Sequence, residues 1–150
     1  MKPESSPTYR ALNTYTKLMR AAESVTSRVN RYMSAANLTI SQFGVLEALL
    51  HKGSLCQRDI GAKILKSTGN ITLVIDNLEK HGLVLRERSS SDRRYITVHL
   101  TPAGSALISR VFSDVEAAIV AEMSCLQVNE QELLGSLCKK LGLKGGHDMT

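Results

Sequence analysis

The sequence predicts a mainly α-helical fold that carries one small antiparallel β-hairpin. Apolar residues recur at the spacing of a helix over most of the chain. Two short helix-sized segments meet at a tight turn, and two β-prone runs then flank a polar segment that contains arginines. This order of elements is a winged helix-turn-helix with further helices at both ends. A length of 150 residues corresponds to one domain, so we expect a single domain over residues 1–150.

The first long helix is expected at about residues 8–36, where apolar residues follow each other in steps of three and four. Thr39 and Gln42 fit a capping box, in which Thr39 caps the next helix and Gln42 reaches back. Gly53 is a natural end for that helix. Residues 54–56 are expected to form a connector or a short strand.

The helix-turn-helix is expected to consist of a short helix at 57–65, a turn, and a second helix from Ser67 to about His81, with Gly82 as its cap. One face of the second helix is apolar, and its members are Ile71, Val74, Ile75 and Leu78. Gly69, Leu73 and Asp76 point the opposite way, at 100° per residue. The sequence thus predicts one buried face and one that is free to meet a partner.

The hairpin is expected from strands at about 84–88 and 95–100. Thr101 and Pro102 then fit the cap and first position of another long helix. Asn129 is expected to cap a last helix with four leucines: Leu133, Leu134, Leu137 and Leu141. The helices at 8–36 and 102–141 therefore enclose a central lobe at 39–101.

Basic charge is concentrated in the middle of the chain. The net charge is +5, and residues 52–94 carry nine Lys and Arg against five Asp and Glu. Residues 95–150 carry four against six. Such a distribution suits a polyanion, because neutralised phosphates release counterions. The alternative is a basic protein with no such partner.

Several function classes find no support in the residues. Cys56, Cys125 and Cys138 form no close pair and no zinc-type cluster, which favours a reducing cytoplasm and no metal or other cofactor. No apolar run reaches the length of a membrane span. No convergent catalytic set or phosphate-binding glycine loop is present, so we do not expect an enzyme.

The start of the second helix offers short polar side chains for base edges or phosphates: Ser67, Thr68, Asn70 and Thr72, with Gly69 among them. Leu73 could touch a thymine methyl group, whereas Asp76 would repel phosphates and restrict contact to the first two turns. The alternative is a core helix with an ordinary polar start.

The hairpin offers a basic tip for a narrow minor groove, at Arg93 and Arg94. Asp92 is expected to orient Arg94 through a bidentate pair. Arg86 and Arg88 share one face of the first strand and are candidates for backbone phosphate. Solvated surface charge is the alternative for each. The combination predicts a protein that binds double-stranded DNA.

Residues 67–104 resemble the multiple antibiotic resistance regulator (MarR) family of bacterial winged-helix regulators. The segment Leu78-Glu79-Lys80-His81-Gly82-Leu83-Val84 is similar to that family's end of the recognition helix. Asp92-Arg93-Arg94, followed by Leu100-Thr101 and Gly104, matches its D-x-R…L-T-x-x-G wing signature. Leu38-Thr39…Gln42-Phe43…Leu46 is similar to its preceding helix, and the order of helices agrees over nearly the whole chain.

The resemblance implies a homodimer in which residues 8–36 and 102–141 interleave, with Arg94 in the minor groove and Asp92 as its partner. It also implies a transcription regulator that a small aromatic or phenolic effector, or thiol oxidation, releases from DNA. Many members carry a basic residue in place of Leu73, which bears on base specificity.

A pocket for such an effector is expected where the first, second and fifth helices meet the central lobe. Its candidate residues are Tyr32, Met33, Phe43 and Leu46, for which a core role is the alternative. The peroxide-sensing branch uses a cysteine in the first helix, which this chain lacks. A redox role for Cys125 or Cys138, and a winged-helix module that binds protein rather than DNA, stay open as alternatives.

Overall fold

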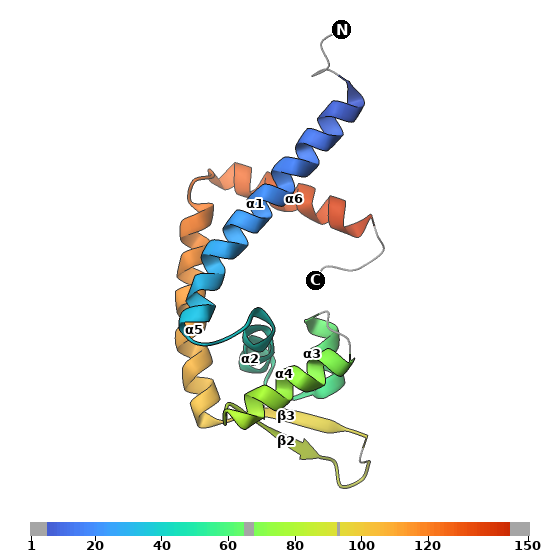
Figure 1. Ribbon diagram of the computed structural model, residues 1–150, viewed down its shortest axis with the longest axis vertical. Coiled ribbons are helices and arrows are strands. Elements are labelled where there is room, and N and C mark those ends of the chain that lie inside the picture. Colours follow the sequence, from blue (N-terminus) through green and yellow to red (C-terminus); the bar gives the residue numbers. More distant parts are fainter. Residues whose placement is uncertain (1–5, 65–67, 93, 145–150) are drawn as a thin grey trace. The chain divides into compact units, whose positions relative to one another are not determined.

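A computed structural model describes residues 6–64, 68–92 and 94–144. The helices and strands in chain order are α1 (Pro7–Ala35), α2 (Ile40–Lys52), β1 (Leu55–Cys56), α3 (Gln57–Lys63), α4 (Thr68–Lys80), β2 (Val84–Arg88), β3 (Ile96–Leu100), α5 (Pro102–Met123) and α6 (Val128–Leu143) (Figure 1). This is the mainly helical winged helix-turn-helix that the sequence predicted. The chain forms two compact units, Met1–Val115 and Glu116–Thr150, and α5 runs from one into the other.

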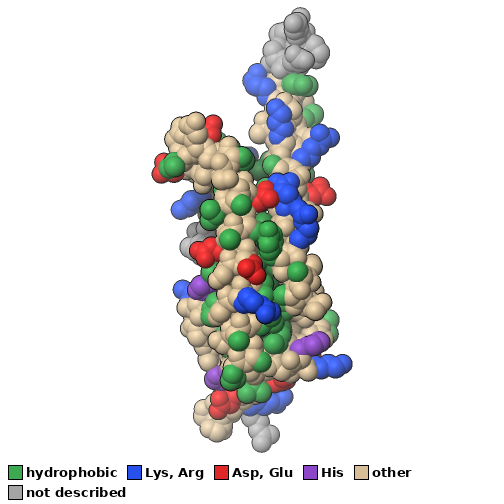
Figure 2. Space-filling view, turned by 90° about the vertical axis from the view of Figure 1, so that its left-hand side faces the viewer, with side chains coloured by type: hydrophobic (Ala, Val, Ile, Leu, Met, Phe, Trp, Pro, Cys, Tyr) green, Lys and Arg blue, Asp and Glu red, His purple; other side chains and the backbone are tan. Residues whose placement is uncertain are grey.

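Helix α1 begins where its sequence provides a cap. The side chain of Ser6 accepts a hydrogen bond from the backbone N–H of Tyr9 at 3.0 Å, and Pro7 occupies the first turn. Its Lys and Arg residues recur on one exposed face (Figure 2): Arg10, Lys17, Arg20, Arg28 and Arg31. The helix ends one residue before the expected position, and Asn37 follows in the left-handed conformation with a φ of 57°.

The predicted capping box of α2 is present in full. The backbone N–H of Gln42 donates to Oγ1 of Thr39 at 3.1 Å, and the backbone N–H of Thr39 donates to Oε1 of Gln42 at 2.9 Å. Gly53 ends the helix with a φ of 76°, which glycine adopts without a steric cost.

The hairpin is part of a three-stranded antiparallel sheet with the order β1-β3-β2. Residues 54–56, expected as a connector or a strand, contain β1, in which Leu55 pairs with Val98. In the hairpin itself Arg86 lies opposite Val98 and Arg88 opposite Ile96. β1 therefore connects the wing to α3, because it pairs with β3 and leads directly into that helix.

The core of the first unit joins every helix from α1 to α5. Its fully buried side chains come from α2, α3, α4, α5 and both hairpin strands: Val45, Leu46, Ile60, Ile71, Ile75, Leu78, Val84, Val98 and Ile108. Three of these belong to the predicted apolar face of α4. The burial of that face leaves the opposite face of α4 at the surface.

The junction between α4, β2 and α5 is closely packed. Oγ1 of Thr101 donates to the carbonyl of Gly82 at 2.6 Å and accepts from the backbone N–H of Gly104 at 3.0 Å. A Cβ atom on Gly104 would lie 1.9 Å from the carbonyl oxygen of Leu83. The glycine of the wing signature is therefore required by this close approach of two backbone segments.

Helix α6 begins earlier than expected. Its cap is Gln127 rather than Asn129, and Gln127 forms a capping box with Glu130. The side-chain amide of Gln131 also donates to the carbonyls of Met123 and Leu126, both at 3.1 Å, which holds the first turn against the end of α5. The sequence offers two overlapping caps for this helix, one at Gln127 and one at Asn129. The contacts of Gln131 with the end of α5 favour the earlier one. The four leucines of α6 are exposed in the single chain.

Candidate nucleic-acid interface

The exposed face of α4 carries the side chains that the sequence assigned to base contact. Asn70 is exposed, and Leu73 keeps 61% of its surface in solvent. Thr68 and Gly69 form the first turn of α4, whereas Ser67 lies outside the described residues.

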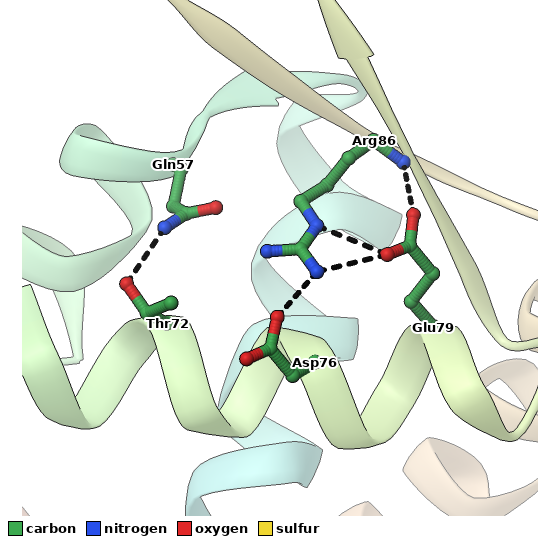
Figure 3. Close-up of polar contacts among 5 residues, drawn as sticks. All are labelled: Gln57, Thr72, Asp76, Glu79 and Arg86. Carbon is green, nitrogen blue, oxygen red and sulfur yellow. Dashed lines mark hydrogen bonds and ion pairs between the residues drawn. The ribbon is translucent and has the colours of Figure 1, made fainter.

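Thr72 has a partner within the protein. Nε2 of Gln57, at the start of α3, donates to Oγ1 of Thr72 at 3.0 Å (Figure 3). The bond joins the two helices of the helix-turn-helix close to the surface. Sequence reasoning assigned Thr72 to DNA and did not single out Gln57, because the bond spans fifteen residues.

The wing tip is built around Asp92. Its Oδ1 accepts from the backbone N–H of Arg94 at 3.0 Å and from Nε of Arg94 at 3.1 Å, and its Oδ2 accepts from Nη2 at 3.0 Å. The Arg94 side chain nevertheless remains 89% exposed. The carboxylate thus fixes the direction of the guanidinium and leaves its outer edge to solvent, in the bidentate geometry that the sequence predicted. Arg93 lies outside the described residues.

The charges at the wing tip hold each other in the ionised form. Hydrogen bonds from the side chain and then the backbone of Arg94 lower the pKa of Asp92, and the bond to Asp92 raises the pKa of Arg94. The pair therefore persists throughout the neutral range.

The two arginines of β2 differ in their surroundings. Arg88 is exposed, in keeping with a surface role. Arg86 instead points toward α4, where Glu79 and Asp76 bind its guanidinium, and 22% of its side chain is exposed (Figure 3). The sequence suggested that Arg86 contacts backbone phosphate. In the structure its hydrogen-bonding edge already has carboxylate partners, Glu79 and Asp76.

A hollow of about 450 Å³ lies beside the wing, between α3, α4 and β3. Arg58 and Arg94 contribute to its walls, together with Cys56, Gln57 and Ile71. The four residues expected to line an effector pocket lie elsewhere. Met33, Phe43 and Leu46 are buried in the core, and Tyr32 is exposed on α1. Three of the four are therefore packed within the core of the single chain.

The described residues contain no group of three or more His, Cys, Asp or Glu side chains placed to hold a metal ion. Among the same residues, no helix is both long enough and apolar enough to cross a membrane. The three cysteines are free; Cys125 and Cys138 are exposed and Cys56 is half-buried.

A helix-turn-helix followed by an arginine-tipped wing defines a winged-helix DNA-binding protein. Residues 38–96 match the model of the MarR family. The chain is also 35% identical, over 136 residues, to the HTH-type transcriptional regulator MhqR of Bacillus subtilis (strain 168), an alignment that covers 91% of this chain and 94% of that protein. The chain therefore belongs to the MarR family of DNA-binding transcriptional regulators, a family of regulators rather than enzymes.

Two solved structures extend the comparison. A mutant of MarR from E. coli, in complex with operator DNA, has a TM-score of 0.78 at 22% identity, and the match covers 91% of this chain and 99% of that one. NadR in complex with 4-hydroxyphenylacetate has a TM-score of 0.68 at 26% identity, and the match covers 84% of this chain and 89% of that one. The first of these establishes a common fold.

Proposed function

We propose that this protein is a homodimeric, ligand-responsive repressor that binds a pseudo-palindromic operator. The exposed Arg94, held by Asp92 at the tip of the wing that follows α4, is the observation that carries the proposal. An arginine oriented in this way suits a narrow minor groove, while the start of α4 suits the adjacent major groove. A dimer that fills these grooves over a promoter would exclude RNA polymerase.

The proposed contact surface comprises the start of α4 and the wing: Ser67, Thr68, Gly69, Asn70, Thr72, Leu73, Arg88, Asp92, Arg93 and Arg94. Leu73 is the candidate for a thymine methyl group, since it is apolar and exposed. Arg86 was a candidate on the same grounds, but its guanidinium is bound by Glu79 and Asp76, so it is not included.

Substitution of Arg94 by alanine tests the proposal. Operator fragments would first be selected from random DNA, and affinity would then be measured by fluorescence anisotropy. We expect Arg94→Ala to bind about 10- to 100-fold more weakly, because a positioned groove contact is lost. Arg110→Ala removes the same charge from an exposed site on α5 and is the control, with an expected affinity close to the wild type. Equal binding by all three proteins would remove the wing from the mechanism.

The exposed apolar residues of the terminal helices support the homodimer. The amino half of α1 exposes Tyr9, Leu12, Tyr15 and Met19, and α6 exposes its four leucines. Apolar faces of this length in water favour association. We expect the wild type to sediment as a dimer and Leu137→Glu to sediment as a monomer. A wild-type monomer would contradict the proposed two-fold operator, whose half-sites lie about one helical turn apart.

The ligand is proposed to be a small aromatic or phenolic acid, as the crystal structure of NadR with 4-hydroxyphenylacetate suggests for a relative of the same fold. Such a ligand can release DNA only by its preference for a dimer whose recognition helices are wrongly spaced. Titration of the operator complex with a panel of hydroxylated aromatic acids and quinones tests this, and release by none of them would contradict it.

Three free cysteines agree with a cytoplasmic setting.

A further inference from the structure

We propose that Arg86 is a positioning residue, which locks the wing to the recognition helix and so sets where Arg94 meets the DNA. The inference rests on the proposed DNA binding. It assigns to Asp76 and Glu79 a supporting role in operator recognition, although both are acidic and lie on the helix that approaches the phosphates.

The contacts join one side chain of β2 to two side chains of α4. Nε and Nη2 of Arg86 donate to Oε2 of Glu79 at 3.1 and 2.9 Å, and Nη2 also donates to Asp76. The other carboxylate oxygen of Glu79 accepts from the backbone N–H of Arg86 at 3.0 Å. Glu79 therefore holds both the backbone and the side chain of β2 (Figure 3).

The position of Arg86 in the wing makes this bond mechanically important. Arg86 lies at the centre of β2, opposite Val98 of β3, whose side chain is fully buried. The hairpin continues from there to Arg88 and then to the tip at Asp92 and Arg94. A small change in the angle of β2 against α4 would be magnified at the tip, because the tip lies at the far end of the hairpin.

The network also explains the presence of Asp76 on the exposed face of α4. The sequence predicted that this carboxylate would repel phosphates. In the structure its charge lies against the guanidinium of Arg86, which reduces that repulsion. Hydrogen bonds from the side chain and backbone of Arg86 lower the pKa of Glu79, so that this carboxylate remains a charged partner of Arg86 at neutral pH.

Lysine cannot reproduce this arrangement. A guanidinium presents two N–H groups to one carboxylate and a further contact to a second, whereas an ammonium is a point charge without that fork. At a simple phosphate contact, by contrast, lysine serves nearly as well as arginine. This difference separates a positioning role from a direct one.

Glu79→Gln provides a test, because a purely electrostatic role and a positioning role of Glu79 predict opposite changes in operator affinity. Removal of a negative charge near DNA should tighten operator binding if Glu79 acts only through electrostatics. We expect instead a loss of about 5- to 20-fold, because the fork to Arg86 is weakened. Glu47→Gln, which alters a half-buried carboxylate on α2, outside the dimerisation helices and the proposed contact surface, is the matched control and should leave affinity unchanged. Binding by Glu79→Gln as tight as or tighter than the wild type would overturn the inference.

Arg86→Lys is the second test and keeps the charge constant. We expect a loss of affinity of about 10-fold with an unchanged dependence on salt concentration, since the number of phosphates neutralised stays the same. Retention of wild-type affinity, the result expected for lysine at a simple phosphate contact, would overturn the inference.

Footprinting on the operator distinguishes positioning from general loss of structure. With Arg86→Lys, minor-groove protection by the wing should weaken while major-groove protection by α4 persists at saturating protein. A parallel loss of both protections, or a proportional fall in the folded fraction measured by thermal melting, would contradict the inference.

If the wild type binds no duplex, the proposed function fails as well, whereas wild-type binding with unaffected variants rejects only the role of Arg86.

Discussion

The wing contains two arginine–carboxylate clusters, one at its tip and one at its base, where the middle of β2 lies against α4, and they leave their arginines in different surroundings. At the tip, Asp92 binds a guanidinium that remains 89% exposed. At the base, Glu79 and Asp76 bind a guanidinium that is 22% exposed. The carboxylate at the tip leaves its arginine accessible to solvent, while the carboxylates at the base hold theirs against α4. An arginine in a basic wing is therefore available for a DNA contact only when its hydrogen-bonding edge faces outward.

The separation of the partners along the chain accounts for this difference. Asp92 and Arg94 are two residues apart, so a single turn brings them together. Arg86 meets Glu79 and Asp76 across seven and ten residues, after the chain has left α4 and entered β2. The tip is a local structure, and the base is a tertiary contact that forms only when the whole lobe folds.

The largest expected difference between the two pairs concerns stability. Arg86→Ala leaves Glu79 and Asp76 without their shared partner, and we expect the free energy of unfolding to fall by about 1–2 kcal/mol, in the range for hydrogen bonds to charged groups, discounted for partial exposure. Arg94→Ala should leave it unchanged, because that side chain is in solvent. Urea denaturation of both variants measures this. Equal stability of the two variants would remove the distinction between tip and base.

A smaller effect is expected on DNA affinity when Arg94 loses the carboxylate that orients it. Asp92→Asn keeps the shape of the side chain and weakens the bidentate pair, so Arg94 samples more orientations before it binds. We expect operator affinity to fall about 3- to 10-fold, less than with Arg94→Ala. Tighter binding by Asp92→Asn would show that the loss of an acidic charge outweighs the loss of orientation.

The smallest effect concerns pH. The pKa of Glu79 is lowered in the folded protein, so its ion pair contributes stability above the pKa of the unfolded state. That contribution is lost as pH falls through the lowered pKa of the folded state. The difference in stability between the wild type and Glu79→Gln should therefore be constant near neutrality and should shrink in acid. Because Glu79 is partly exposed, we expect a modest effect; a difference that grew as pH fell would contradict the assignment.

Local patterns were sufficient to predict much of the fold. The capping box at Thr39 and Gln42, the strand bounds of β2 and the pair at Asp92 and Arg94 each depend on neighbours a few residues away. β1 has only two residues, too few for an alternating pattern. The predicted start of α6 was wrong because two possible caps overlap in the sequence. Gln131 favours the earlier one by its contacts with the end of α5.

The candidate site was harder to predict than the fold. A sequence shows which residues are basic, but not whether their hydrogen-bonding groups are already satisfied. Arg86 and Arg88 look equivalent in β2, yet only the former lies against the carboxylates of α4. Thr72 looks like a free polar residue until Gln57 approaches it from α3. Both distinctions depend on packing between elements, which spacing along the chain does not encode.

The close approach at Gly104 has a consequence for how the molecule transmits motion. Gly82, Thr101 and Gly104 bring the end of α4 and the beginning of α5 into direct backbone contact, with Thr101 bonded to both sides. Because these contacts involve backbone atoms, neither segment can shift without breaking a hydrogen bond or creating a clash. A rotation of the first turn of α5 should therefore carry the end of α4 with it.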